Sequence, residues 1–539
     1  MISTNEEEKG RVPASTELEQ KEHLIEPTPS QKSPLTPDES AKEGRHGRLT
    51  GALAFAVFSI TLSSFQFGYH IGCVNAPGEL ITKFFVSSHE SLFGDKLSRE
   101  TADLLWSIAV AMFAVGGMIG GLSNGWAADR FGRKGALLLN NILAFVAAVL
   151  MTLAKYVNVY PLIIAGRLII GINCGLSSGL VPMYLTEISP VNLRGTIGSI
   201  HQLLVTISIL VSQIFGLPFI FGTEHAWPYI LAFTVVPSAI QLICLPMCAE
   251  SPKYSLIVKK RPEQAEKDLK KLRADDNVTA EINEMKEEEV EASSQKKVTI
   301  ADLFGPNLRK FLIIAVMMML SQQLSGINVA MFYSTVIFKS AGLAGQGPVY
   351  ATIGMGAVNV IMTVIAVWLV DHPSPKLGRR SLHLAGLTGM LISSLLLVVS
   401  LALYNNGKKE LGGENPYQWA SYAAIAFVLL FVISFATGPG AIPWFFVSEI
   451  FHSNERAAAN SIAVAVNWTA NLLVGLCFLP LNNAIGEYSF LVFCAFLLFF
   501  IFYTFKFVPE TKGKTVDQIK KELGAGSVSK SEDIELSDK

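Results

Sequence analysis

A glutamate and an arginine seven residues apart occur twice in this sequence, each time between two long apolar stretches. Glu187 and Arg194 form the first copy, and Glu449 and Arg456 form the second. The two glutamates and the two arginines are separated by the same number of residues, since 449 − 187 = 262 and 456 − 194 = 262. Two further landmarks recur at nearly this spacing: Gly132-Arg133-Lys134 as Gly378-Arg379-Arg380, and Glu250 as Glu510. The sequence therefore predicts a duplicated membrane unit with two related halves.

The composition supports a membrane protein. Of 539 residues, 50% are hydrophobic and only 16% are charged. Apolar runs of about 20 residues, long enough to cross a bilayer, recur along the chain. The formal net charge of −1 gives no bias toward polyanions, so no nucleic-acid partner is expected. A soluble enzyme is excluded, and the six cysteines have no paired spacing that would indicate a metal or cofactor site.

The apolar runs predict an all-α membrane protein with twelve transmembrane helices in two pseudo-symmetric six-helix halves. Helical spacing of apolar residues between the halves predicts short amphipathic cytosolic helices there. The first tail is rich in Glu, Lys, Ser and Pro and is expected to be disordered. The predicted parts are a disordered cytosolic tail (1–48), the first half (49–248), a cytosolic helical linker (249–307), the second half (308–511) and a second cytosolic tail (512–539).

The distribution of basic residues predicts the orientation. Lysines and arginines gather in the turns after spans 2, 4, 8 and 10, whereas the turns after spans 5 and 11 carry none. Basic turns stay in the cytoplasm. Both tails and the linker are therefore expected to be cytosolic, and the long 73–103 loop to be external.

Several ordered motifs resemble those of one family. These are GRLIIGINCGLSSGLVPMYLTEISP, HQLLVTISILVSQ, SQQLSGIN, GPGAIPWF, NWTANLLVG and VPETKGKT, spread over roughly residues 50 to 515. They are similar to the sugar porter branch of the major facilitator superfamily, and specifically to the GLUT-type facilitative hexose transporters. The resemblance implies plasma-membrane uniport of a hexose by alternating access between inward-facing and outward-facing states.

Polar amides inside the spans support a neutral polyol as the ligand. An amide in a membrane is costly unless it meets a partner or water. It both donates and accepts hydrogen bonds, as a sugar hydroxyl does. The resemblance implies that the sugar contacts are Gln202, Gln322, Gln323, Asn328, Asn359, Trp444 and Asn467, and that Tyr333 is an external gating aromatic. The alternative is that such amides only join helices, which is the interpretation adopted for Gln213.

The charged residues at span ends are expected to be gate residues rather than sugar ligands. By the family pattern, pairs across the two halves form when the inner gate is shut and part when it opens. Topology alone is the alternative for the basic residues, but it does not explain the acidic ones. The expected gate residues are Arg133, Glu187, Arg194, Glu250, Arg379, Arg380, Glu449 and Arg456.

Some positions depart from the family pattern. Ala436 stands where glucose-transporting members commonly have Glu, whereas Trp444 matches the aromatic of glucose-preferring members. Trp444 offers a large flat face to the sugar ring, so glucose is favoured and a fructose-preferring carrier is the alternative. Met319 and Met331 replace a Gln and an aromatic, and the HPSPK insertion leaves the register of the 371–380 turn open.

His70 lies in span 1, where proton-coupled relatives carry Asp and many uniporters carry Asn. Histidine can change charge between about pH 5 and 8, so a proton-coupled symporter is an alternative. Neutral imidazole can also act as an amide-like partner, and the spans show no acid to relay a proton, so uniport is favoured. A non-transporting sugar sensor and a channel are further alternatives; the short second tail and the duplicated halves with a broken span 10 argue against them.

Overall fold

The computed structural model describes residues 47–294, 298–371, 377–410, 416–514 and 516–523. Most of both predicted tails and the HPSPK insertion lie outside the described residues. Every regular element in the described part is helical, and α19 (Val516–Glu522) lies within the predicted second tail.

Ten helices in the described part are long and apolar enough to cross a membrane. Two of them, Arg99–Tyr156 and Asn454–Phe507, each hold two spans, which gives the twelve predicted. The first half contains α2 (Gly51–Gly72), α4 (Arg99–Tyr156), α5 (Pro161–Ile188), α6 (Arg194–Phe215), α7 (Trp227–Ala232) and α8 (Val235–Cys244). The second contains α11 (Arg309–Gln323), α12 (Ile327–Ser340), α13 (Gly347–Asp371), α14 (Arg379–Glu410), α15 (Gln418–Thr437), α16 (Ile442–Ile450), α17 (Ser453–Ile485) and α18 (Phe490–Phe507).

Gly132 divides α4 into two spans. Its backbone has φ 81° and ψ 170°, a conformation that favours glycine. A Cβ at this position would also lie 2.5 Å from Glu250 Oε2 and 2.7 Å from the Tyr254 ring. Glycine is therefore required at this turn for two independent reasons.

Two spans of the second half are broken. The predicted break in span 10 is confirmed, because α15 ends at Thr437 and α16 begins at Ile442 after the Gly-Pro-Gly segment. A second break, which was not predicted, separates α11 from α12 at Gly326, with φ 91°. Broken helices free backbone groups that must be satisfied inside the protein, so both breaks create polar positions within the bundle.

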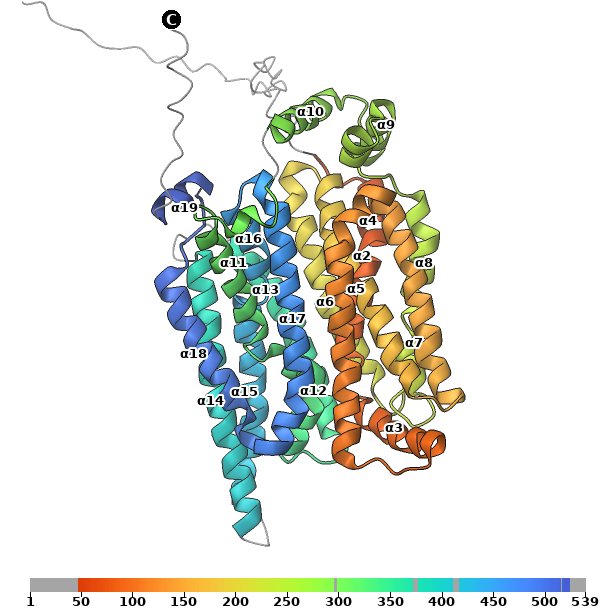
Figure 1. Cartoon of the computed structure of the whole chain (residues 1–539), viewed down its shortest axis with the longest axis vertical. Helices are drawn as coiled ribbons and strands as arrows, with labels where there is room; N and C mark the ends of the chain where they lie inside the picture. The colour runs from red at the N-terminus through yellow and green to blue at the C-terminus, as the bar shows by residue number, and fades with distance from the viewer. Residues whose placement is uncertain (1–46, 295–297, 372–376, 411–415, 515, 524–539) are drawn as a thin grey trace, which may run out of the picture. The chain divides into compact units, whose positions relative to one another are not determined.

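The bundle has two distinct ends (Figure 1). At one end lie α9 (Pro262–Arg273) and α10 (Thr279–Ser294), the predicted linker helices, and this is called the linker end. At the other lies α3 (Gly78–Phe93), a helix inside the segment predicted as a long loop, and this is called the α3 end. The linker helices share a small apolar core and are joined to the first half, since Arg273 Nη1 donates to Ile188 O over 2.8 Å.

The glycines of α4 pack in two directions. A Cβ at Gly116 or Gly120 would lie within 2.2 Å of an α5 carbonyl, so this face allows close contact within the first half. A Cβ at Gly117 would lie 2.6 Å from ring atoms of Trp468 on α17. The missing side chain of Gly117 therefore leaves the space into which the Trp468 ring of the second half packs, and this space is called the Gly117 notch.

We expect Gly117→Ala to lower the thermal unfolding midpoint of the purified protein. The added methyl overpacks the contact with Trp468, which costs about 1–3 kcal/mol. Gly125→Ala is the matched control, because nothing lies within 4 Å of its Cβ position. Equal midpoints for the two variants would contradict the role assigned to the Gly117 notch.

Candidate functional site

Four of the predicted sugar-contacting amides lie together. Gln323 Nε2 donates to Asn467 Oδ1 over 2.9 Å, and Asn467 Nδ2 donates to Gln322 Oε1 over 2.8 Å. Asn328 Nδ2 donates to Gln323 Oε1. All four residues are buried, and they come from α11, α12 and α17. This group, Gln322, Gln323, Asn328 and Asn467, is called the amide cluster.

Gln322 also joins the amide cluster to the break in span 10. Its Nε2 donates to Pro439 O over 3.0 Å and to Gly440 O over 2.8 Å. These carbonyls lie between α15 and α16, where they lack regular helical partners. One side chain thus stabilises the broken helix and presents its amide oxygen to the amide cluster. A ligand that changes the hydrogen bonds of Gln322 would act directly on the break.

The other three predicted sugar contacts lie outside the amide cluster. Gln202 on α6 is half-buried, and Asn359 on α13 is buried. Trp444 on α16 is 38% exposed, which leaves one large aromatic face accessible. Their side chains form no hydrogen bond with the cluster among the described residues. Their assignment as sugar contacts stays a prediction.

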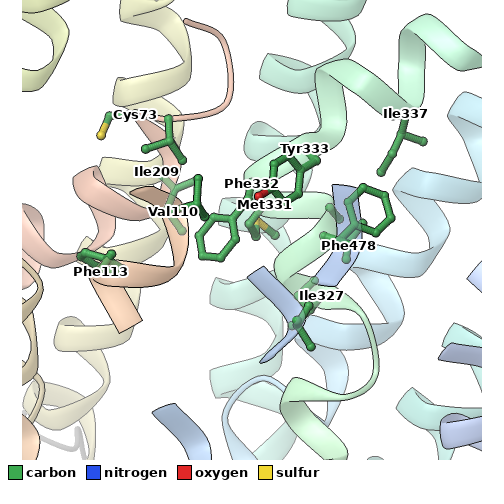
Figure 2. Packing of buried hydrophobic residues seen from close by; sticks show 14 of the residues in the cluster. Cys73, Val110, Phe113, Ile209, Ile327, Met331, Phe332, Tyr333, Ile337 and Phe478 are labelled. Carbon is green, nitrogen blue, oxygen red and sulfur yellow. The ribbon is translucent and has the colours of Figure 1, made fainter. Parts of the chain in front are cut away.

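Tyr333 of α12 packs against α17 of the same half, near the α3 end. Its hydroxyl donates to Gly475 O over 3.0 Å, and its ring centroid is 5.3 Å from that of Phe478 (Figure 2). The same apolar cluster contains Val110 and Phe113 of α4. Tyr333 is only 2% exposed, so it occupies a closed contact in this structure.

Asn75 joins the halves beside this contact. Its Nδ2 donates to Met331 O over 2.8 Å and to Ser334 Oγ over 2.6 Å, and its Oδ1 accepts from Thr335 N over 3.1 Å. Ser334 Oγ lies 2.8 Å from Thr352 Oγ1. All these side chains are buried. This network is called the Asn75 latch, and sequence reasoning missed it because Asn75 lies just past the apolar run of span 1.

The duplicated charges form two equivalent groups at the linker end. Arg133 donates from Nε and Nη2 to the two Glu187 oxygens, each over 2.8 Å, and Arg379 Nε donates to Glu449 Oε1 over 3.2 Å. Each pair therefore lies within its own half: the first pair in the first half and the second pair in the second half. The predicted pairing across the halves is absent among the described residues in this structure, and it stays a prediction for another conformation.

The remaining predicted gate residues repeat this symmetry. Glu250 accepts the backbone N–H of Lys134, and Glu510 accepts those of Arg379 and Arg380. Like Arg380, Arg194 and Arg456 differ from the paired Arg133 and Arg379. Neither forms an ion pair within 4 Å among the described residues, and the Nε of each is buried without a hydrogen-bond partner. Arg194 and Arg456 are thus left available for carboxylates in another arrangement of the halves.

His70 lies next to a buried arginine that sequence reasoning missed. Arg167 on α5 is 1% exposed, and its Nη1 donates to His70 O over 3.1 Å. Its guanidinium lies 4.5 Å from the centroid of the Phe113 ring and forms no ion pair among the described residues. His70 itself is buried, with Nδ1 3.6 Å from Cys73 Sγ. The sequence did contain a signal for Arg167, namely a charged residue inside an otherwise apolar span.

Further buried amides in the first half are structural. Gln241 Oε1 accepts from Asn141 Nδ2 over 2.9 Å, and Gln241 Nε2 donates to Ser59 O over 2.8 Å. Gln66 Nε2 donates to Asn141 Oδ1 over 3.2 Å. These contacts join α2, α4 and α8, so an amide in a span does not by itself mark the sugar path. Gln213 is also fully buried, but neither atom of its side-chain amide has a hydrogen-bond partner among the described residues, so the helix-joining role predicted for it stays a prediction.

Comparison with known proteins agrees with this architecture. Residues 56–523 match the family model described as "Sugar (and other) transporter". The chain is 65% identical over 477 residues to facilitated glucose transporter protein 1 of Caenorhabditis elegans, covering 88% of this chain and 92% of that protein. It is 45% identical over 473 residues to solute carrier family 2, facilitated glucose transporter member 3, of Mus musculus, covering 88% and 93%.

Solved structures show the same fold. The partially occluded inward open conformation of the xylose transporter XylE from E. coli matches with a TM-score of 0.70 and 27% identity, covering 86% of this chain and 100% of that one. A crystal structure of a D-xylose-proton symporter matches with a TM-score of 0.67 and 26% identity, covering 86% and 100%. The chain therefore belongs to the sugar transporter family, has the major facilitator fold, and groups with the facilitated glucose transporters rather than with any enzyme.

Proposed function

We propose that this protein is a facilitative hexose uniporter of the plasma membrane, with D-glucose as its preferred substrate. The amide cluster carries this proposal. It places four neutral donor and acceptor groups beside a broken helix, which suits the hydroxyls of an uncharged sugar. The relatives named as facilitated glucose transporters, up to 65% identical, support the same substrate class.

The preference for glucose rests on Trp444. Trp444 is 38% exposed, and its ring offers a broad contact to a pyranose. Ala436 has no carboxylate to accept a hydrogen bond from the sugar, but a water molecule can take over that contact. We expect the purified protein in liposomes to take up D-glucose faster than D-fructose at equal low concentration, with L-glucose as the control for leakage. Faster uptake of fructose would overturn this preference.

The linker end is proposed to face the cytosol, together with both termini. Basic residues of both repeats, including Lys134 and Arg380, lie at this end, as expected for cytoplasmic turns. The Asn75 latch joins the halves at the α3 end, while the ion pairs at the linker end stay within each half. Together these contacts support an inward-facing conformation.

Uniport is favoured over proton symport by the surroundings of His70. Its nearest charged group is the Arg167 guanidinium, a cation, which would repel a second positive charge on the imidazole. The D-xylose-proton symporter with a similar fold is the reason to keep symport as the second candidate. A proton-coupled carrier would require a group at this position that is charged during part of the cycle.

We expect His70→Asn to retain uptake of D-glucose. An amide supplies the hydrogen bonds of a neutral imidazole without its titration. Uptake should be measured in liposomes between pH 5.5 and 8, with and without sugar on the opposite side. Loss of transport in His70→Asn together with retention of exchange would instead indicate a coupling proton.

A further inference from the structure

A cavity lies at the linker end, away from the amide cluster. Its volume is about 280 Å³, close to the lower end of the range of about 300–1,000 Å³ for small-molecule sites. Its walls come from the turn between the two spans of α4, from residues 248–261 and from α9. No residue predicted for sugar contact lines it. It is called the linker cavity.

Three cations line the linker cavity. Lys259 and Arg261 are exposed and form no ion pair within 4 Å among the described residues. The Lys259 ammonium lies 5.6 Å from the centroid of the Tyr254 ring, which keeps it near the cavity wall. Lys134 Nζ is held by the carbonyls of Pro246 and Cys248, each at 3.0 Å. The carboxylates of Glu250 and Asp268 also line the cavity, but neither forms an ion pair with Lys259 or Arg261 among the described residues, so these two cations stay available to an anion.

An unsatisfied acceptor lies in the same cavity. Asp268 is 7% exposed, and its Oδ1 accepts from Gln264 Nε2 over 3.0 Å. Its Oδ2 is buried and has no hydrogen-bond partner among the described residues. Burial raises the pKa of this carboxyl group. A hydroxyl donor from a ligand would satisfy this oxygen, because a buried acceptor without a partner costs about 1–3 kcal/mol.

We propose that the linker cavity binds a phosphorylated polyol. The phosphate would lie between Lys259 and Arg261, since guanidinium and ammonium groups both bind phosphate strongly. A hydroxyl of the polyol would donate to Asp268. Two sources share this chemistry, namely a soluble sugar phosphate and the headgroup of an inositol phospholipid. The lipid source would use Phe131, which lines the cavity and is 43% exposed, with its ring 5.7 Å from that of Trp126.

Binding should be measured by titration calorimetry on the full chain purified in detergent. The probes are D-glucose 6-phosphate and a short-chain phosphatidylinositol 4-phosphate, with inorganic phosphate for comparison. We expect saturable binding of at least one phosphorylated polyol, at least about tenfold tighter than inorganic phosphate because a hydroxyl contact is added. Binding of only one probe identifies the source, and binding of both supports the shared chemistry.

Reversing the charges of Lys259 and Arg261 tests whether the phosphorylated polyol binds in the linker cavity. Lys259→Glu with Arg261→Glu should weaken binding by about tenfold or more, because two charge-assisted contacts are lost. Lys267→Glu with Lys286→Glu is the matched control, since both lysines are exposed on the linker helices, lie outside the cavity and give the same change of charge. This control should bind as the parent does.

Four results would overturn the proposal. They are no saturable binding of either probe, equal affinity for inorganic phosphate, unchanged binding in the Lys259 and Arg261 double variant, and competition by excess D-glucose. Competition would place the phosphate compound in the transport path instead. The linker cavity does not depend on the preferred hexose or on uniport, so failure of either leaves this test intact.

Discussion

Gln322→Ala is expected to abolish most glucose uptake by the purified protein in liposomes. The variant removes the donor to Pro439 O and Gly440 O and the acceptor for Asn467 Nδ2. Unsatisfied buried groups cost about 1–3 kcal/mol, which corresponds to about a 5- to 150-fold change. The loss should appear in KM for D-glucose as well as in the maximal rate, since the same side chain is proposed to contact the sugar and also stabilises the broken span.

Gln241→Ala is the matched control for this prediction. Gln241 is also a fully buried amide with four hydrogen-bonded partners, but it joins helices of the first half away from the amide cluster. Its removal should lower the unfolding midpoint and leave KM unchanged. A similar rise of KM in both variants would mean that Gln322 acts only through stability, and the sugar-contacting role would be wrong.

Asn75→Leu should shift the protein toward a conformation that is open at the α3 end. Leucine has a similar volume but removes the acceptor for Thr335 N–H and the donor to Met331 O and Ser334 Oγ while the halves are in contact, so that Ser334 keeps only Thr352 as a partner among the described residues. Water satisfies these groups once the halves separate, so only the closed state is destabilised. The expected change in the ratio of the two states is about 5- to 150-fold.

Spin labels at the exposed positions Ser87 and Ala344 would measure this shift, because they lie near the α3 end on opposite halves. The distance distribution should move to longer values in Asn75→Leu. Asn483→Leu is the control, since Asn483 also reaches across the halves, to Asp103 over 3.4 Å, but is exposed to solvent. Exposed contacts of this kind contribute little, about 0–1 kcal/mol. An equal shift in both variants would contradict the special role of the latch.

The sequence predicted features whose cause is local. The length of the runs of apolar residues predicted the membrane spans. The Gly-Pro-Gly segment predicted the break after Thr437, because proline and glycine act on the backbone of their own helix. These features need no knowledge of how distant segments pack.

Features that depend on distant segments could not be predicted. Asn75 forms its hydrogen bonds with residues about 260 positions away, and the sequence around it resembles that of an ordinary loop after a span. At the break, Gly326 is packed against Phe493, whose ring would lie 2.9 Å from a Cβ there, and this contact is with a residue far away in the sequence. Gln322 was predicted from its motif, but its hydrogen bonds to Pro439 O and Gly440 O depend on a segment more than 100 residues away and could not be predicted.

Counterflow in liposomes, with and without an imposed proton gradient, tests the central proposal most directly. A facilitative carrier that alternates between two states should exchange external radiolabelled D-glucose faster when unlabelled sugar is inside. Without internal sugar, the labelled sugar should only equilibrate, whatever the proton gradient. Accumulation above the external concentration under an inward proton gradient would contradict uniport, and the absence of acceleration by internal sugar would contradict alternating access.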